Sequence, residues 1–205
     1  FYVGTWNGGN SYTGDGYSGI YVWGAQLEAG SFPTSYIPTS GSTVTRAVDS
    51  ASMTGSNFTN WFSQQEGTFY SEHQSVASIN QRVYAANDNG SNSNAIQAVI
   101  TTSGGSGLVF EVRQSNTGQM FQPSSITPVE GQYYRLAATY ASNDGAVSRD
   151  GDTASLDSSI IIPSVSTFHI GASSTGFGHS LVTIKKIAFY PKRLPNATLQ
   201  AMTEE

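Results

Sequence analysis

The sequence predicts an all-β protein, a sandwich of two antiparallel sheets with one short helical turn near the C-terminus. Three observations predict this fold. The patterned segments repeat with a period of two residues rather than the 3.6-residue period of a helix. These segments are short, and clusters of Gly, Ser, Asn and Asp that favour turns separate them. The one helix-like stretch is 194–203, where Pro195 and Asn196 can begin one or two turns.

The expected strands follow from this alternation. Residues 96–100 and 108–113 each place every second side chain on one face. In 134–140, residues Tyr134, Leu136, Ala138 and Tyr140 share a face in the same way. The same pattern, bounded by turn-forming residues, predicts further short strands at 67–74, 81–88, 145–151, 166–172 and 180–190.

Two connections are also expected from local chemistry. Asn143, Asp144 and Gly145 supply the turn of a hairpin over 140–151. By contrast, residues 40–60 have no sustained period and many small polar residues, with one short strand expected at 44–49. This aperiodic stretch is therefore the best candidate for a boundary between modules.

The composition limits the partners. Charged residues make up 11% of the chain, and nine basic residues with a net charge of −5 leave no cationic footprint for a nucleic acid backbone. No run of about 18 apolar residues occurs, so membrane insertion is not expected. The absence of Cys excludes disulfides, thiolate nucleophiles and thiolate zinc sites.

A series of motifs in the second half of the chain resembles a known superfamily. "YYRLAATYASNDGAVSRDG" (133–151) is followed by "FHIGASSTGFGHSLVTIKKIAFYPKRLPNATLQAMT" (168–203). The expected elements follow in the order strand, Asp-Gly turn, Ile-Gly strand, Gly-rich loop, long strand and helical turn. This order resembles the concanavalin A-like lectin/glucanase superfamily in its laminin-G-like form, over roughly 55–203. The resemblance implies a two-sheet antiparallel jelly-roll sandwich.

The beginning of the chain resembles a different module. The segment "GIYVWGAQLEAGSFPTSYIP" (19–38) resembles the last strand of the carbohydrate-binding-type jelly rolls that precede such domains in bacteriophage tail and other virion proteins. The resemblance implies a terminal strand at 21–28 and a penultimate strand at 1–9. We therefore expect 1–40 to be the terminal strands of an upstream jelly-roll module or a linker, and 41–205 to be the laminin-G-like sandwich.

The sequence does not favour an enzyme. The glucanase branch of the superfamily uses two carboxylates that share one glycosidic bond. Glu72 and Glu111 each stand on an expected strand without a partner carboxylate nearby in the sequence. The three histidines, His73, His169 and His179, lie on separate elements without metal-ligand spacing. No G-x-S-x-G motif selects a nucleophilic serine.

Binding of a saccharide needs only aromatic faces together with amide, carboxylate and guanidinium groups. Such residues stand at the ends of three expected strands and converge if those strands are neighbours in a sheet. The alternative interpretation is that Asn-Asp-Asn-Gly (87–90) and Asn-Asp-Gly (143–145) only form turns. Trp61 and Phe62 are expected to plug the sandwich. The candidate ligand-binding residues are Tyr84, Asn87, Asp88, Arg113, Tyr140, Asn143 and Asp144.

A calcium ion is a further implication of the resemblance, because laminin-G-like domains often hold one ion through Asp, Asn and main-chain oxygens. Asp144, Asp150 and Asp152 are the candidate ligands, with Asp157 as a fourth. The spacing is not that of an EF-hand, and oxygen clusters in loops are common without metal.

Together these observations favour a non-enzymatic module of a phage virion protein, a tail fibre or capsid decoration, that binds a glycan or host cell-surface polysaccharide. Weak affinity per site makes repeated copies, and hence a homo-oligomer, physically sensible. Assembly would take place in the host cytoplasm and binding outside the cell, with other virion proteins as further partners. Two alternatives stay open: a purely structural virion module that makes protein–protein contacts, and a glycan-cleaving enzyme.

Overall fold

The computed structural model describes residues 13–17, 21–29, 35–46, 51–75, 81–89, 91–101, 107–123, 129–172 and 180–204. The chain divides into two units, Phe1–Ala47 and Val48–Glu205. The division falls inside the aperiodic stretch 40–60 of the sequence. Within the described residues, no helix is long and apolar enough to cross a membrane.

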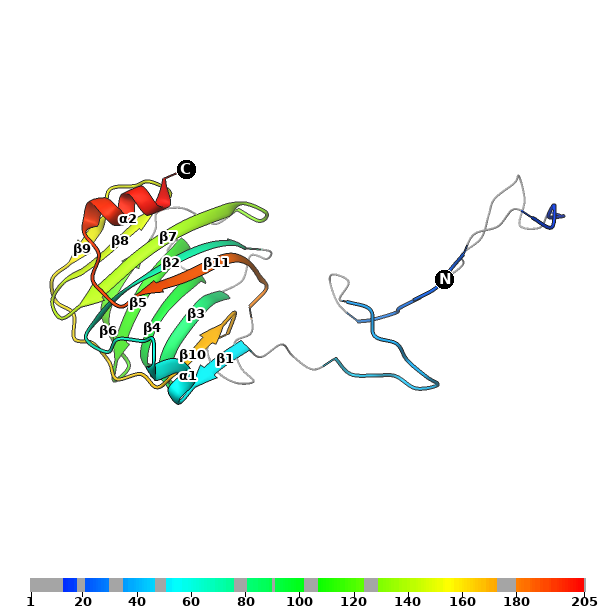
Figure 1. The fold of residues 1–205 in the computed structure, drawn as a ribbon, viewed down its shortest axis with the longest axis horizontal. Helices are drawn as coiled ribbons and strands as arrows, with labels where there is room; N and C mark the ends of the chain where they lie inside the picture. The colour runs from blue at the N-terminus through cyan, green and yellow to red at the C-terminus, as the bar shows by residue number, and fades with distance from the viewer. Residues whose placement is uncertain are drawn as a thin grey trace. The chain divides into compact units, whose positions relative to one another are not determined.

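The second unit is a sandwich of two antiparallel sheets, with a helix against the outside of one sheet (Figure 1). This is the jelly-roll fold class that the sequence predicts. The six-stranded sheet has the order β1 (Ala51–Thr54), β10 (Thr167–Ile170), β3 (Gln81–Asp88), β4 (Ser91–Thr101), β5 (Gly107–Gln114) and β6 (Thr117–Pro123). The five-stranded sheet has the order β11 (Val182–Tyr190), β2 (Glu66–Ser75), β7 (Tyr133–Ala141), β8 (Gly145–Arg149) and β9 (Ser155–Asp157).

Most expected elements are confirmed, and the differences have local causes. The strand expected at 145–151 ends at Arg149, because Asp150 and Gly151 adopt positive φ angles of 44° and 82°. Strands β1, β6 and β9 and the short helix α1 (Ser56–Thr59) were not expected. The predicted C-terminal turn is the helix α2 (Asn196–Thr203), directly after Pro195.

The core between the sheets is rich in aromatic rings. Phe69 on β2 stacks on Tyr84 of β3 and on Phe168 of β10, with ring centroids 4.7 and 5.8 Å apart. Trp61 and Phe62 are partly buried and pack against this cluster, which confirms their expected role as a plug. Stacked and edge-to-face rings of this kind add to the free energy gained from burial alone.

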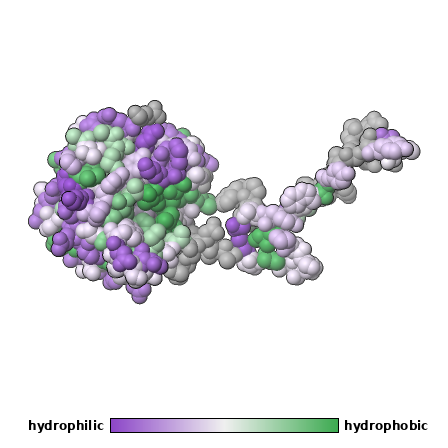
Figure 2. All heavy atoms as spheres, viewed as in Figure 1, coloured by the Kyte–Doolittle hydropathy of each residue, from purple (hydrophilic) through white to green (hydrophobic). Residues whose placement is uncertain are grey.

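The outer faces of the two sheets differ. Helix α2 covers part of the five-stranded sheet, where Leu199 is fully buried against Tyr70, Ala137 and Ala146. On the face of the sandwich seen in Figure 2, hydrophilic and near-neutral residues surround a smaller hydrophobic area.

The first unit departs from the sequence-based expectation. The described residues 21–29 and 35–46 form no strand, so the strand predicted at 21–28 is wrong for this structure. The strand expected at 1–9 lies outside the described residues, as does the end of the one expected at 44–49. Trp23 and Tyr36 make an edge-to-face contact, with ring centroids 5.7 Å apart. A strand requires hydrogen-bonded neighbours, and the described residues of this unit offer none.

A buried histidine in the sandwich leads to a prediction about pH. His73 shares the inward face of β2 with Phe69, and neither ring nitrogen has a hydrogen-bond partner among the described residues. Burial lowers the pKa of His73 from 6.5 to about 4. The unfolded chain keeps the ordinary pKa, so protonation favours unfolding as the pH falls below 6.5. This group alone should cost about 2 kcal/mol of folding free energy between pH 7 and pH 5.

The measurement is urea unfolding of the native chain and of His73→Leu at both pH values. We expect the loss of stability on acidification to be smaller in the variant by about that amount. An equal loss in both proteins would contradict the buried, neutral state of His73.

Candidate functional site

The sequence predicts that several turns meet at one end of the sandwich, and the topology brings them together. The turns between β3 and β4 and between β5 and β6 lie at the same end because these strands are antiparallel neighbours. The Asn116 amide donates to Ser93 O at 2.9 Å, and the Ser115 amide donates to Asn94 Oδ1 at 2.9 Å. The β7–β8 turn is near: a Cβ on Gly145 would lie 2.7 Å from Met120 Sδ of β6.

Backbone geometry explains the amide residues of these turns. Asn89, Asn116 and Asn143 have positive φ angles of 46°, 66° and 56°. Asn tolerates this conformation better than most residues with a side chain. Asp88 and Asn143 are exposed, and Asp144 is exposed but accepts a hydrogen bond from Arg193 Nη2 at 2.7 Å. A sugar-binding role for these side chains stays a prediction.

Three of the candidate ligand-binding residues are buried, and the prediction is wrong for them. Tyr84 and Tyr140 point between the sheets and are fully buried, and burial raises the pKa of both hydroxyl groups. The Tyr140 hydroxyl donates to Ser63 O at 2.6 Å. Asn87 is also fully buried, and its Oδ1 accepts a hydrogen bond from Thr167 Oγ1 at 2.7 Å. These groups hold the sandwich together and are withdrawn from its surface.

The predicted calcium ligands do not come together. Asp144 precedes β8, whereas Asp150 and Asp152 follow it. The length of this strand therefore separates them, and it puts Asp144 about 20 Å from Asp150. Asp157 lies at the end of β9 and does not complete a cluster. Among the described residues, no group of three or more His, Cys, Asp or Glu side chains could hold a metal ion. The prediction of this metal site is therefore wrong.

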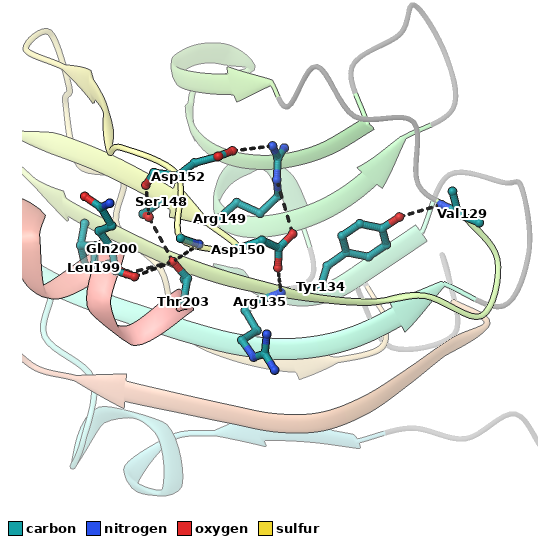
Figure 3. A network of polar contacts seen from close by, with 11 residues as sticks. Val129, Tyr134, Arg135, Ser148, Arg149, Asp150, Asp152, Leu199, Gln200 and Thr203 are labelled. Atoms are coloured by element: carbon teal, nitrogen blue, oxygen red, sulfur yellow. Dashed lines mark hydrogen bonds and ion pairs between the residues drawn. The ribbon is translucent and has the colours of Figure 1, made fainter. Parts of the chain in front are cut away.

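Asp150 and Asp152 instead belong to a polar network between the end of β8 and helix α2 (Figure 3). Asp150 Oδ1 accepts the Arg135 amide at 2.7 Å, and Asp152 Oδ2 pairs with Arg149 Nη2 at 2.8 Å. Burial raises the pKa of Asp150. The hydroxyl of Thr203 completes the network, because it accepts the Gly151 amide and lies 3.1 Å from Ser148 Oγ. These carboxylates thus stabilise the turn after β8.

The structure reveals a second polar site on the outer face of the six-stranded sheet. It comprises Arg82 on β3, Gln97 on β4, and Glu111 and Arg113 on β5, a set that we call the polar row. Gln97 and Glu111 are directly opposite in the β4–β5 register. Their neighbours along the strands, among them Ile96 and Phe110, point into the core, so these polar side chains point outward.

Hydrogen bonds join the polar row across three strands. Arg82 Nε donates to Gln97 Oε1 at 3.1 Å, and Gln97 Nε2 donates to Glu111 Oε2 at 2.7 Å. Arg113 Nη1 lies 3.5 Å from Glu111 Oε1 and Nη2 donates to Asn116 O at 3.3 Å. Gln97 is fully buried, while the Glu111 and Arg113 side chains are 15% and 30% exposed. The row is therefore held rigidly, with its charged members accessible at the surface.

Some polar atoms of this face have no protein partner. Arg113 Nε is buried and without a hydrogen bond among the described residues. His169 Nε2 is in the same condition, and the register His169–Ala85–Gln97 puts this imidazole on the same outer face as the polar row. Burial lowers the pKa of His169, so the ring is neutral at pH 7. Buried polar groups of this kind are normally satisfied, so these two unpaired atoms are exceptions beside the polar row.

Of the polar row, the sequence singles out only Arg113 as a binding residue. Glu111 stands in the sequence as a lone carboxylate, and Arg82 and Gln97 are not among the predicted site residues. The sequence signal that could have identified these residues is a polar side chain at an outward position in each of three expected strands. Only the register between the strands shows that these positions are adjacent.

Comparison with known proteins supports the fold. No family model and no curated protein matches the sequence. Among solved structures, the CBM40 of a Ruminococcus gnavus IT-sialidase bound to α2,3 sialyllactose has a TM-score of 0.56 at 13% identity, over 69% of this chain and 84% of that one. A heptameric SAP-like pentraxin from Limulus polyphemus has a TM-score of 0.54 at 12% identity, over 68% and 70% of the two chains.

A sialidase from Trypanosoma rangeli is also similar, with a TM-score of 0.51 at 16% identity. That match covers 68% of this chain but only 22% of the sialidase. At these identities the likeness concerns the fold. The jelly-roll sandwich of this chain is similar in fold to that carbohydrate-binding module and to that pentraxin.

The central position of Gln97 in the polar row leads to a prediction. Gln97→Leu keeps the approximate size but removes both hydrogen bonds, which leaves Arg82 and Glu111 partly unpaired. We expect the free energy of unfolding to fall by about 1–3 kcal/mol. The measurement is urea denaturation, with the exposed Gln132→Leu as the control. A Gln97→Leu protein as stable as the control would show that the row contributes nothing to the fold.

Proposed function

We propose that this chain is a non-enzymatic carbohydrate-binding module and that the polar row is its saccharide site. The observation that carries the proposal is the row itself, a rigid set of donors and acceptors on the outer face of a sheet. Guanidinium and carboxylate groups bind pairs of sugar hydroxyls through two parallel hydrogen bonds. The row holds these groups in place before the ligand arrives, which lowers the entropy cost of binding.

The accessible ends of the row support the same function. The Arg113 and Glu111 side chains are 30% and 15% exposed, so the first can donate hydrogen bonds to a ligand and the second can accept them. A sugar hydroxyl can both donate and accept, so one ring of a glycan can satisfy groups of either kind. The similarity in fold to a carbohydrate-binding module that was solved with sialyllactose is consistent with this site.

The composition of the row favours binding over hydrolysis. A glycosidase usually needs two carboxyl groups about 5–9.5 Å apart across the scissile bond. Glu111 is the one carboxylate of the polar row, and it lies between Gln97 and Arg113. Its contacts suit it to orient a guanidinium group and to accept hydrogen bonds from hydroxyls.

We further propose that the module is part of a phage virion protein, in a tail fibre or a capsid decoration, and binds a host cell-surface polysaccharide. The support is the sequence resemblance of 19–38 to the last strand of jelly rolls in such proteins. In that setting, other virion proteins would be its neighbours and several copies would act together. Multivalency would raise the strength of attachment well above the affinity of one site.

Glycan-array binding of the native chain and of variants tests the saccharide site. Arg82→Ala and Arg113→Ala should each weaken binding by about tenfold or more, since each removes a hydrogen bond from a charged group. Lys192→Ala, with the same change of charge on an exposed residue away from the row, should bind as the native chain does. Tyr84→Phe should also bind normally, because the Tyr84 hydroxyl is buried.

Thermal unfolding of each variant establishes that it is folded. Undiminished binding by both folded arginine variants would remove the polar row as the site. Absence of binding to every glycan would favour a structural virion module, and release of reducing ends from a polysaccharide would favour an enzyme.

A further inference from the structure

The outer face of the five-stranded sheet carries a second group of charged residues, beyond the area that α2 covers. Arg135 on β7 and Lys185 and Lys186 on β11 lie there beside the ring of Tyr133, a set that we call the basic patch. Lys185 and Lys186 are exposed, and Tyr133 is 44% exposed. Glu72 of β2 lies among them with its side chain 12% exposed.

A β-bulge creates this patch. Successive residues of a regular strand point to opposite faces, so Lys185 or Lys186 would otherwise enter the core. The register of β11 against β2 shifts between Ile184 and Lys186, where Lys185 is the extra residue. As a result, Ile184 and Ile187 both pack against the core and both lysines lie outside. Bulges that redirect side chains in this way are frequent near functional sites.

The contacts within the patch leave an excess of positive charge. Lys186, Glu72 and Arg135 form one row across β11, β2 and β7. Lys185 Nζ lies 2.7 Å from Glu72 Oε1 and 5.6 Å from the centroid of the Tyr133 ring. Lys185 holds the pKa of Glu72 below its usual value, so this carboxylate is ionised and offsets the charge of one of the two lysines.

The next carboxylate along the row, that of Asp150, lies near Arg135 and Arg149. Asp150 Oδ1 accepts the Arg135 amide, the charge of Arg135 acts to lower the pKa of Asp150, and Asp150 Oδ2 lies 3.7 Å from Arg149 Nε. The excess of positive charge therefore comes from the adjacent exposed residues Lys185 and Lys186, of which Glu72 offsets one, in a chain with net charge −5. Such a local excess attracts anions while the protein as a whole repels them.

We propose that the basic patch binds an acidic polysaccharide through the carboxylates of its sugar residues. Lysine and arginine nitrogens pair with carboxylates, and an exposed Tyr ring can contact the C–H face of a sugar. A nucleic acid fits less well, because three cations neutralise little of its backbone and the net charge of −5 opposes a long polyanion. This patch is on the sheet opposite the polar row, so the proposal does not depend on the saccharide site there.

The test uses the full chain and polygalacturonate as the acidic polysaccharide, in affinity electrophoresis and calorimetry at low and physiological ionic strength. We expect binding that weakens as salt is added. The double variant Lys185→Ala/Lys186→Ala should bind about tenfold more weakly, since two exposed charge contacts together contribute about that factor. Lys185→Arg/Lys186→Arg should bind as the native chain does.

Matched variants establish whether the binding depends on this patch in particular. Lys192→Ala, which also removes an exposed lysine, and Arg113→Ala, which alters the polar row, should both retain polygalacturonate binding. Unchanged affinity in the double alanine variant, or an equal loss in Lys192→Ala, would overturn the proposal. Neutral dextran should not bind at the patch, and tighter binding of duplex DNA than of polygalacturonate would also overturn it.

Discussion

The alternation of side chains along paired strands is the constraint on which the rest of this structure depends. Each ring or branched side chain that enters the core obliges its neighbours to face outward. Ile96 and Ala98 point inward, so Gln97 lies outside, and Phe110 and Val112 place Glu111 outside in the same way. The packing of the core therefore also determines the polar row, because it fixes the register of the strands that carry these residues.

Two departures from strict alternation decide what each outer face presents. In β3 the register shifts between Arg82 and Tyr84, which lets Arg82 join the polar row while Tyr84 enters the core two residues later. In β11 the shift at Lys185 keeps two adjacent lysines outside. Each bulge thus lets a cationic side chain point outward at a position where regular alternation would point it into the core. The two candidate binding surfaces share this origin although they lie on different sheets.

The unpaired polar atoms of the sandwich have different consequences between the sheets and on the outer face. His73 lies between the sheets, where the lack of partners costs stability and lowers the pKa of its ring. His169 Nε2 and Arg113 Nε are on the outer face of the six-stranded sheet, beside groups that a ligand can reach. The first case makes the fold sensitive to acid, whereas the second leaves two unpaired buried groups beside the polar row.

Part of this architecture follows from the sequence alone. The period of two, the turn residues and the Pro195 that precedes a helix are local signals, so most strands, the sandwich class and α2 could be predicted. The same local signals assigned Tyr84 and Tyr140 to a surface, because alternation by itself does not say which face is the inner one. The family resemblance placed Asp144 with Asp150 in one calcium site, although β8 separates them.

Only the tertiary structure decided where the functional groups meet. Arg82, Gln97, Glu111 and Arg113 come from three consecutive strands, and their contact depends on the hydrogen-bond register between those strands. The basic patch likewise requires a β-bulge in β11, and no residue of "TIKKIAFY" (183–190) predicts that bulge. Strand identity is encoded within a few neighbouring residues, whereas register and the inner face are set by packing across the whole core. For this reason the sequence determined the elements, and the folded sandwich determined the sites.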